Sequence, residues 1–253
     1  MCPLSRRPIL LVFLSCLGLQ TGCATYLPQL RLESPEATGS EKLGRAELAG
    51  TQGGVNLSAE VAMRDQPAQK DADGNPLPAD PPVPYLQPTW AAFFVGFVKG
   101  FGDSWDLGIR LLQPTAPFQV RVKYQFLGQP ESRAEFGNFS LAALVSPGLT
   151  AGPGNGTETL FYLAGDVTLL AGIRLGRSHL IWLSPSFTFA SISGLASTAG
   201  AAGGTVLTYG GGVGYQLTVL GFFGRAEFNW AWGSAGENRI DGPSLGALVG
   251  LRL

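Results

Sequence analysis

Residues 118–126 read Phe-Gln-Val-Arg-Val-Lys-Tyr-Gln-Phe, and they alternate throughout: every even position is apolar or aromatic and every odd position is polar. Side chains two residues apart along a β-strand lie on the same face of the sheet. The stretch therefore predicts a strand with one apolar face and one face that carries Arg121 and Lys123. Residues 55–63 follow a similar period of two.

The same period continues to the last residue, and no apolar run after residue 22 is long enough for a membrane-spanning helix. Each predicted strand is near the 9–11 residues or so that a tilted strand needs to cross a bilayer. We expect an all-β fold, a closed antiparallel transmembrane β-barrel of ten strands, with eight or twelve as alternatives. The ten strands are 54–64, 90–101, 105–112, 117–127, 136–146, 159–175, 180–192, 205–217, 222–232 and 244–253.

The composition separates this barrel from other classes. Only 14% of the 253 residues are charged, against about 25% in ordinary soluble domains, which is little for an exterior that faces water. A soluble sandwich or a lipocalin-like fold alternates in the same way and is the alternative. The net charge of −1 argues against a nucleic-acid partner. The single histidine excludes multi-histidine metal sites, and we expect neither a metal nor a cofactor.

The first 22 residues have the features of an export signal. Arg6 and Arg7 precede an apolar run at 9–19 that is too short to span a membrane. We expect residues 23–50 to form an N-terminal periplasmic linker and residues 51–253 to form the barrel. A buried N-terminal helix is the alternative for the leader.

Several motifs resemble those of outer-membrane β-barrel proteins of Gram-negative bacteria. Residues 100–111 resemble a hairpin common in that family, with a tight Gly/Asp turn followed by Asp-Leu-Gly-Ile-Arg. Residues 244–251 resemble the signal read by the barrel-assembly machinery, although Leu253 replaces the usual terminal aromatic residue. The resemblance implies an outer-membrane location, contact with membrane lipids and recognition of strand 244–253 by that machinery. A four-residue motif recurs at 108–111, 172–175 and 250–253. It consists of glycine, an aliphatic residue, arginine and leucine, and we expect its glycine and arginine to face inward.

Residues 19–25 resemble a bacterial lipobox, which implies lipidation of Cys23. Gly22 and Thr21 fit the motif, whereas Gln20 replaces an expected apolar residue. Cleavage after Ala24 by ordinary signal peptidase is the alternative. By the same resemblance, Ala24 favours the outer membrane.

The connections between predicted strands differ in length. Long segments at 65–89, 147–158, 193–204 and 233–243 alternate with short ones at 102–104, 176–179 and 218–221, as in outer-membrane barrels. An even number of strands places the start of the first and the end of the last on one side, so we expect both termini in the periplasm. Aromatic residues gather near strand ends as in interfacial girdles: Trp90, Trp230 and Trp232 on the loop side, and Trp105, Tyr215 and Phe222 on the turn side.

By parity, seven cations and four carboxylates face the lumen. Buried charges must be paired or hydrated, so the lumen is either a salt-bridged plug or a narrow water path with a slight preference for anions. These residues are Glu60, Arg64, Asp106, Arg110, Arg121, Lys123, Asp166, Arg174, Arg225, Glu227 and Arg252.

We expect a non-enzymatic structural or interaction protein, with a narrow passive pore for small solutes as the alternative. The least favoured alternative is an enzyme that modifies lipids or peptides. His179 lies in a turn on the periplasmic side, remote from the outer rim where such enzymes act, and Asp166 with Glu227 is the conceivable acid pair.

Overall fold

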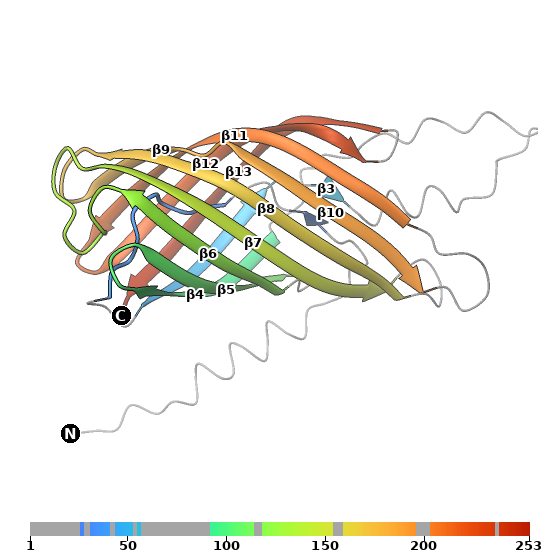
Figure 1. Cartoon of the computed structure of the whole chain (residues 1–253), viewed down its shortest axis with the longest axis horizontal. Helices are drawn as coiled ribbons and strands as arrows, with labels where there is room; N and C mark the ends of the chain where they lie inside the picture. The colour runs from blue at the N-terminus through green and yellow to red at the C-terminus, as the bar shows by residue number, and fades with distance from the viewer. Residues whose placement is uncertain are drawn as a thin grey trace, which may run out of the picture.

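The described part of the chain is built from β-strands (Figure 1). The computed structural model describes residues 26–27, 31–40, 44–52, 55–56, 92–113, 118–153, 159–195, 203–235 and 238–253. Within these residues there is no helix long and apolar enough to cross a membrane.

One antiparallel sheet closes on itself through pairing of β13 with β2. A separate small sheet joins β1 (Tyr26–Leu27) to β3 (Val55–Asn56). The strands of the closed sheet are β2 (Arg45–Gln52), β4 (Ala92–Phe101), β5 (Trp105–Gln113), β6 (Phe118–Leu127), β7 (Phe139–Pro153), β8 (Thr159–Arg174), β9 (His179–Leu183), β10 (Ser186–Leu195), β11 (Gly203–Val219), β12 (Phe222–Ala235) and β13 (Asn238–Arg252).

β9 and β10 share one position in the ring. Both pair with β8 on one side and β11 on the other, and the register continues from Leu183 to Ser186 without a shift. Pro185 separates them because proline has no N–H to donate to a neighbouring strand. The barrel therefore has ten strand positions, which confirms the predicted closed antiparallel barrel.

The two ends of the barrel differ in their connections. One end, the turn end, carries residues 102–104, 128–138, 175–178 and 220–221, whereas the other, the loop end, carries the connections at 53–91, 114–117, 154–158, 196–202 and 236–237. The C-terminus lies at the turn end (Figure 1), where the Leu253 amide donates to the carbonyl of Gly44 over 2.9 Å.

The first barrel strand differs from the prediction. The ring begins with β2 (Arg45–Gln52), in the stretch assigned to a linker, so the predicted domain boundary at residue 50 falls inside a strand. This strand is short and its outward face includes the small Ala46, which makes its alternation weak in the sequence. Of the predicted strand 54–64, the structure describes only the two residues of β3.

The strands also extend further toward the loop end than predicted. β7 reaches Pro153, β11 begins at Gly203, and β12 and β13 together leave only residues 236–237 between them. Much of the segments 147–158, 193–204 and 233–243 is therefore strand. Their glycine, serine and alanine content predicted loops. In the structure, hydrogen-bonded pairing with the neighbouring strands continues through these segments. Segment 65–89 lies outside the described residues.

The predicted alternation of faces is confirmed on the described strands. On β6, Arg121, Lys123 and Gln125 are buried inside the barrel, whereas Tyr124 and Phe126 are exposed outside it. The recurring motif at 108–111, 172–175 and 250–253 behaves as predicted: its arginines point inward, and its aliphatic residues are exposed.

Inward glycines make room for large interior side chains. A Cβ atom on Gly214 would lie 2.0 Å from the indole of Trp182, which is 2% exposed and belongs to the buried cluster with Leu144 and Leu170. Glycine at this position therefore lets the ring lie against the wall of β11.

Replacing this glycine tests the packing. Gly214→Ala is expected to lower the free energy of unfolding by about 1–3 kcal/mol, because the tryptophan must leave its position. Urea titration followed by the heat-modifiability gel shift measures it. Gly165→Ala on β8 is the matched control, since no atom lies within 4 Å of its Cβ position. Equal stability of the two variants would contradict the packing described.

Candidate functional site in the barrel lumen

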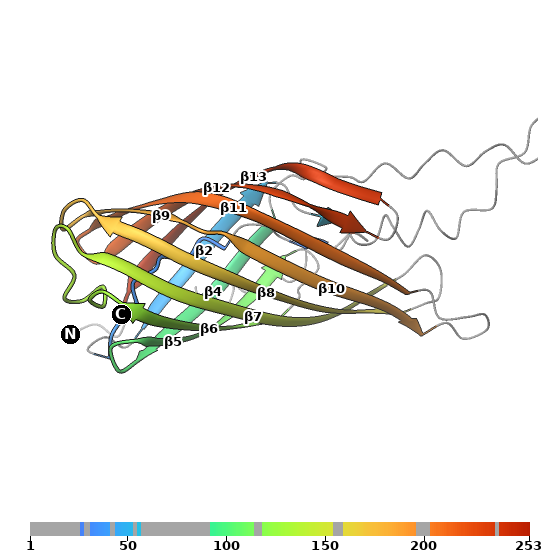
Figure 2. The same ribbon diagram turned by 45° about the horizontal axis from the view of Figure 1, so that its top comes forward.

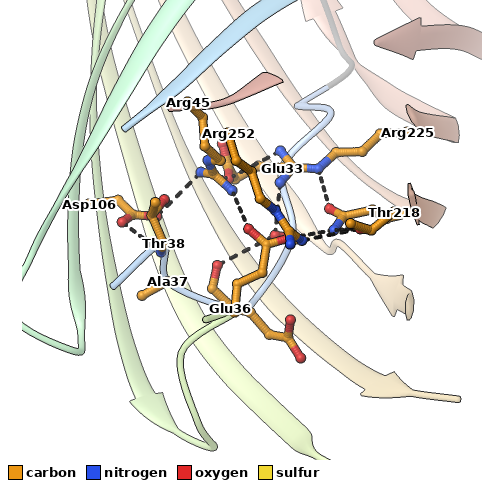
Figure 3. A network of polar contacts seen from close by, with 12 residues as sticks. Glu33, Glu36, Ala37, Thr38, Arg45, Asp106, Thr218, Arg225 and Arg252 are labelled. Atoms are coloured by element: carbon orange, nitrogen blue, oxygen red, sulfur yellow. Dashed lines mark hydrogen bonds and ion pairs between the residues drawn. The ribbon is translucent and has the colours of Figure 1, made fainter. Parts of the chain in front are cut away.

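The barrel lumen is filled by a segment of the same chain. Residues 31–39, called the internal segment below, are all buried although they form no helix or strand. They lie inside the ring, and side chains from strands all around it bond to them (Figure 3).

The start of the internal segment lies midway along the strands. The backbone amide of Leu32 donates to Glu227 on β12 over 2.6 Å, and Arg31 donates to Thr188 on β10 over 2.6 Å. Arg31 also forms an ion pair of 2.9 Å with Asp166. Leu32 has a φ of 48°, an uncommon backbone conformation that these bonds hold in place.

Glu33 is the centre of the charge network. Its carboxylate pairs with Arg45 at 2.9 Å, Lys123 at 3.1 Å and Arg225 at 3.4 Å, and it also bonds to Arg121. These four cations come from β2, β6 and β12. In the ring, β6 lies opposite β12, and β2 lies between them. Figure 3 shows Arg45 and Arg225 beside Glu33. A single carboxylate of the internal segment therefore connects strands from separate parts of the barrel.

Backbone groups of the internal segment are satisfied by the wall as well. Lys123 donates to the carbonyls of Ser34 and Glu36 over 3.0 and 2.7 Å, and Arg110 donates to the carbonyl of Arg31 over 2.6 Å. A buried carbonyl without a partner would cost about 1–3 kcal/mol. The cations thus stabilise the extended path of the segment, in addition to neutralising its carboxylates.

The end of the internal segment lies at the turn end. The Thr38 amide donates to Asp106 over 2.9 Å, and the Ala37 carbonyl accepts from the Glu131 amide over 2.7 Å. Glu36 forms a two-pronged contact with Arg174. A Cβ atom on Gly100 would lie 2.4 Å from the Gly39 carbonyl, so glycine permits close approach of the two backbones there.

Glu47 is a second centre of the charge network, and it lies on a strand of the barrel rather than on the internal segment. Glu47 on β2 pairs with Arg110 at 2.9 Å, Arg121 at 3.3 Å and Arg225 at 3.5 Å. The Arg110 guanidinium also stacks over the ring of Phe94, with its carbon 4.0 Å from the ring centre. Arg110, Arg121 and Arg225 are thereby shared between Glu47 and Glu33.

Glu131, in the connection 128–138, reaches back into the turn end of the lumen. Burial disfavours its charged form, but Arg252, Arg45 and Arg225 outweigh that effect and lower its pKa to about 2. Gln216 donates a further hydrogen bond to it. This glutamate therefore stays ionised and links the turn to the first and last strands.

The structure places the predicted lumen charges as follows. Nine of them lie inside the ring, eight fully buried and Arg252 partly exposed, whereas Glu60, Arg64 and the lipidation candidate Cys23 lie outside the described residues. The nine are Asp106, Arg110, Arg121, Lys123, Asp166, Arg174, Arg225, Glu227 and Arg252. Asp166 and Glu227, the conceivable acid pair, both bind Arg31.

Six interior charges are absent from the predicted set: Arg31, Glu33, Glu36, Arg45, Glu47 and Glu131. With them, the described lumen holds eight cations and seven carboxylates, so the predicted excess of three cations falls to one. The predicted excess of cations was the signal that could have indicated the missing carboxylates. Unpaired cations in a narrow lumen require carboxylates from elsewhere in the chain.

The outer surface offers little chemistry by comparison. His179 lies at the start of β9, where its Nδ1 atom is 2.6 Å from the Tyr215 hydroxyl, and both side chains are exposed. The part of the chain that the structure describes contains no group of three or more histidine, cysteine or acidic residues that could hold a metal ion.

Comparison with known proteins adds no family to these observations. No protein-family model matches the sequence, and no curated protein matches it either.

Removing the central carboxylate tests its role. Glu33→Gln removes the negative charge that five buried cations share, so the free energy of unfolding should fall by about 3–5 kcal/mol. Denaturant titration of the folded barrel measures the loss. Asp103→Asn is the matched control, because the pair of Asp103 with Arg133 is about half exposed and contributes about 1 kcal/mol or less. A loss for Glu33→Gln no larger than for the control would contradict the central role of Glu33.

The lowered pKa of Glu131 predicts a pH dependence. The unfolded chain protonates this residue near pH 4.3, whereas the folded protein keeps it charged to about pH 2. Its stabilising contribution is therefore complete above pH 5 or so and is lost as the pH falls toward 2. The stability difference between the wild type and Glu131→Gln should shrink over that range. A difference that stays constant down to pH 2 would contradict this.

Proposed function

We propose that the protein is a barrel of the bacterial outer membrane, closed by its own N-terminal segment, with a non-enzymatic structural or interaction role. The observation that carries the proposal is that charged side chains face the inside of the barrel and apolar side chains face the outside, the reverse of a soluble protein. Arg121 and Lys123 are buried inside, whereas Leu107, Ile109 and Leu111 on the neighbouring strand are each at least 40% exposed outside.

The exterior supports insertion into lipid. Apolar side chains are exposed on all the strands around the ring, far more than the few hundred Å² that soluble monomers expose in one patch. β5 has nine residues and is therefore about 30 Å long. A strand of this length that is tilted by about 40° from the barrel axis spans about 23 Å along that axis. That height fits the apolar band of outer-membrane barrels.

Aromatic residues support two boundaries for that band. Trp230 and Trp232 lie together with Tyr209 in the loop half, and Trp230 donates to Asp241 over 2.7 Å. Trp105 packs on Tyr124 at the turn end, with ring centres 4.5 Å apart. Lys99 is exposed near this end, where a long side chain can reach the headgroups. Trp90 lies outside the described residues.

The filled lumen favours a closed barrel over the pore alternative. The internal segment bonds to strands around the ring, and the described interior charges nearly balance. Such a barrel would act through its outer surfaces and ends rather than by passing solutes. The export leader and an acyl group on Cys23 belong to the same proposal, as does recognition of strand 244–253 by the assembly machinery.

Conductance in planar bilayers tests the closed barrel. The wild type should be silent, because the internal segment occupies the lumen. Glu33→Gln combined with Glu36→Gln should raise the frequency of openings, provided that a gel shift shows that it is folded. Asp103→Asn is the control and should stay silent. Steady conductance of the wild type would contradict the closed barrel, and a change of ion selectivity in Arg121→Gln would then support the pore alternative.

A further inference from the structure

The internal segment runs antiparallel to β2. It begins at Arg31, which contacts Thr188 and Glu227 midway along the strands, and ends at Gly39, beside Gly100 at the turn end. The chain then passes Gly44, next to the C-terminal residue, and returns along β2 toward the loop end. The path toward the N-terminus from Arg31 therefore points away from the turn end.

The pairing of β1 with β3 shows where that path leads. Tyr26 pairs with Asn56 and Leu27 pairs with Val55. β3 begins three residues after Gln52, which is the loop-end limit of β2. Figure 1 labels β3 on the side of the barrel remote from the C-terminus, and Figure 2 shows the arrow of β2 pointing away from the C-terminus.

We infer that the chain is threaded through its own barrel, so that the amino terminus of the mature protein emerges at the loop end, opposite the C-terminus. The acyl chains of a lipidated Cys23 would then enter the lipid leaflet at the loop end. The membrane part of this inference rests on the proposed function. Outer-membrane barrels turn their longer loops to the cell exterior, so the leaflet at the loop end would be the outer one.

Chain length limits how far Cys23 can lie from β1. Two residues separate it from Tyr26, so the three steps along the chain reach about 11 Å at most. The two ends of the eight-residue β2 are about 23 Å apart. The internal segment lies in the lumen from the middle of the strands to the turn end, so an acyl group cannot return through that part of the barrel to the turn-end leaflet.

This threading changes the expectation that both termini lie on one side. The parity argument holds for the ring, because β2 begins and β13 ends at the turn end. The parity argument fails for the chain as a whole, because residues 31–39 of the predicted periplasmic linker lie in the lumen. The predicted linker of 28 residues is long enough for this path. The parity argument missed the path because it counts only strands.

Cross-linking of the purified full chain tests the direction of threading without reference to a membrane. In a background with Cys2, Cys16 and Cys23 all replaced by serine, Arg31→Cys with Thr188→Cys should be joined by a short bis-maleimide. Thr38→Cys with Asp106→Cys, tested separately, should be joined as well. Arg31→Cys with Asp106→Cys is the control and should not be joined. Linkage of the control pair together with failure of both other pairs would overturn the inference.

Epitope tags test the side of the membrane. One tag is inserted between Thr25 and Tyr26, with reference tags at 236–237 for the loop end, between Gly102 and Asp103 for the turn end, and after Leu253. On intact cells, an antibody should bind the N-terminal and loop-end tags, and it should bind the other two only after permeabilisation.

The outcomes separate the two proposals. An N-terminal tag that becomes accessible together with the turn-end tag, rather than with the loop-end tag, overturns threading even if the barrel spans the membrane. If the protein is instead recovered without detergent, with the loop-end and turn-end tags equally accessible, the proposed function fails. The cross-links alone then decide whether the chain is threaded.

Discussion

The structure depends on the neutralisation of charges that the barrel encloses. Arg45, Arg121, Lys123 and Arg225 all face the same small volume, and Glu33 is the carboxylate that they share. Removing such groups from water costs several kcal/mol per ion unless opposite charge and hydrogen bonds replace the lost hydration. The internal segment supplies both, because its carboxylates pair with the cations and its backbone bonds to them.

The wall and the internal segment are mutually adapted. Gly172 faces Pro35, whose side chain would lie 2.8 Å from an added Cβ atom, and Gly100 faces the backbone of Gly39. Elsewhere the wall fills the lumen with its own large side chains, such as Trp182 beside Gly214. The described interior of the barrel is thus buried, whereas its exterior exposes apolar side chains.

The sequence predicted those features that follow from local periodicity. Alternation over residues 118–126 placed Arg121 and Lys123 inside, because the face of a strand is set by neighbours in the chain. The internal segment has no period, and its contacts join residues far apart in sequence, such as Leu32 with Glu227. β2 was missed because the strand is short and the small Ala46 on its outer face weakens the alternation. Only the charge imbalance of the predicted lumen pointed to missing carboxylates.

Hydrogen exchange of the full chain in detergent tests most directly whether the internal segment closes the lumen. The amides of Leu32, Ala37 and Thr38 donate to Glu227, Gln125 and Asp106, respectively. The account predicts that a peptide covering these amides exchanges as slowly as peptides from β6 and β12. Exchange at the rate of an unstructured chain, while the strands remain protected, would show that the segment does not lie in the lumen.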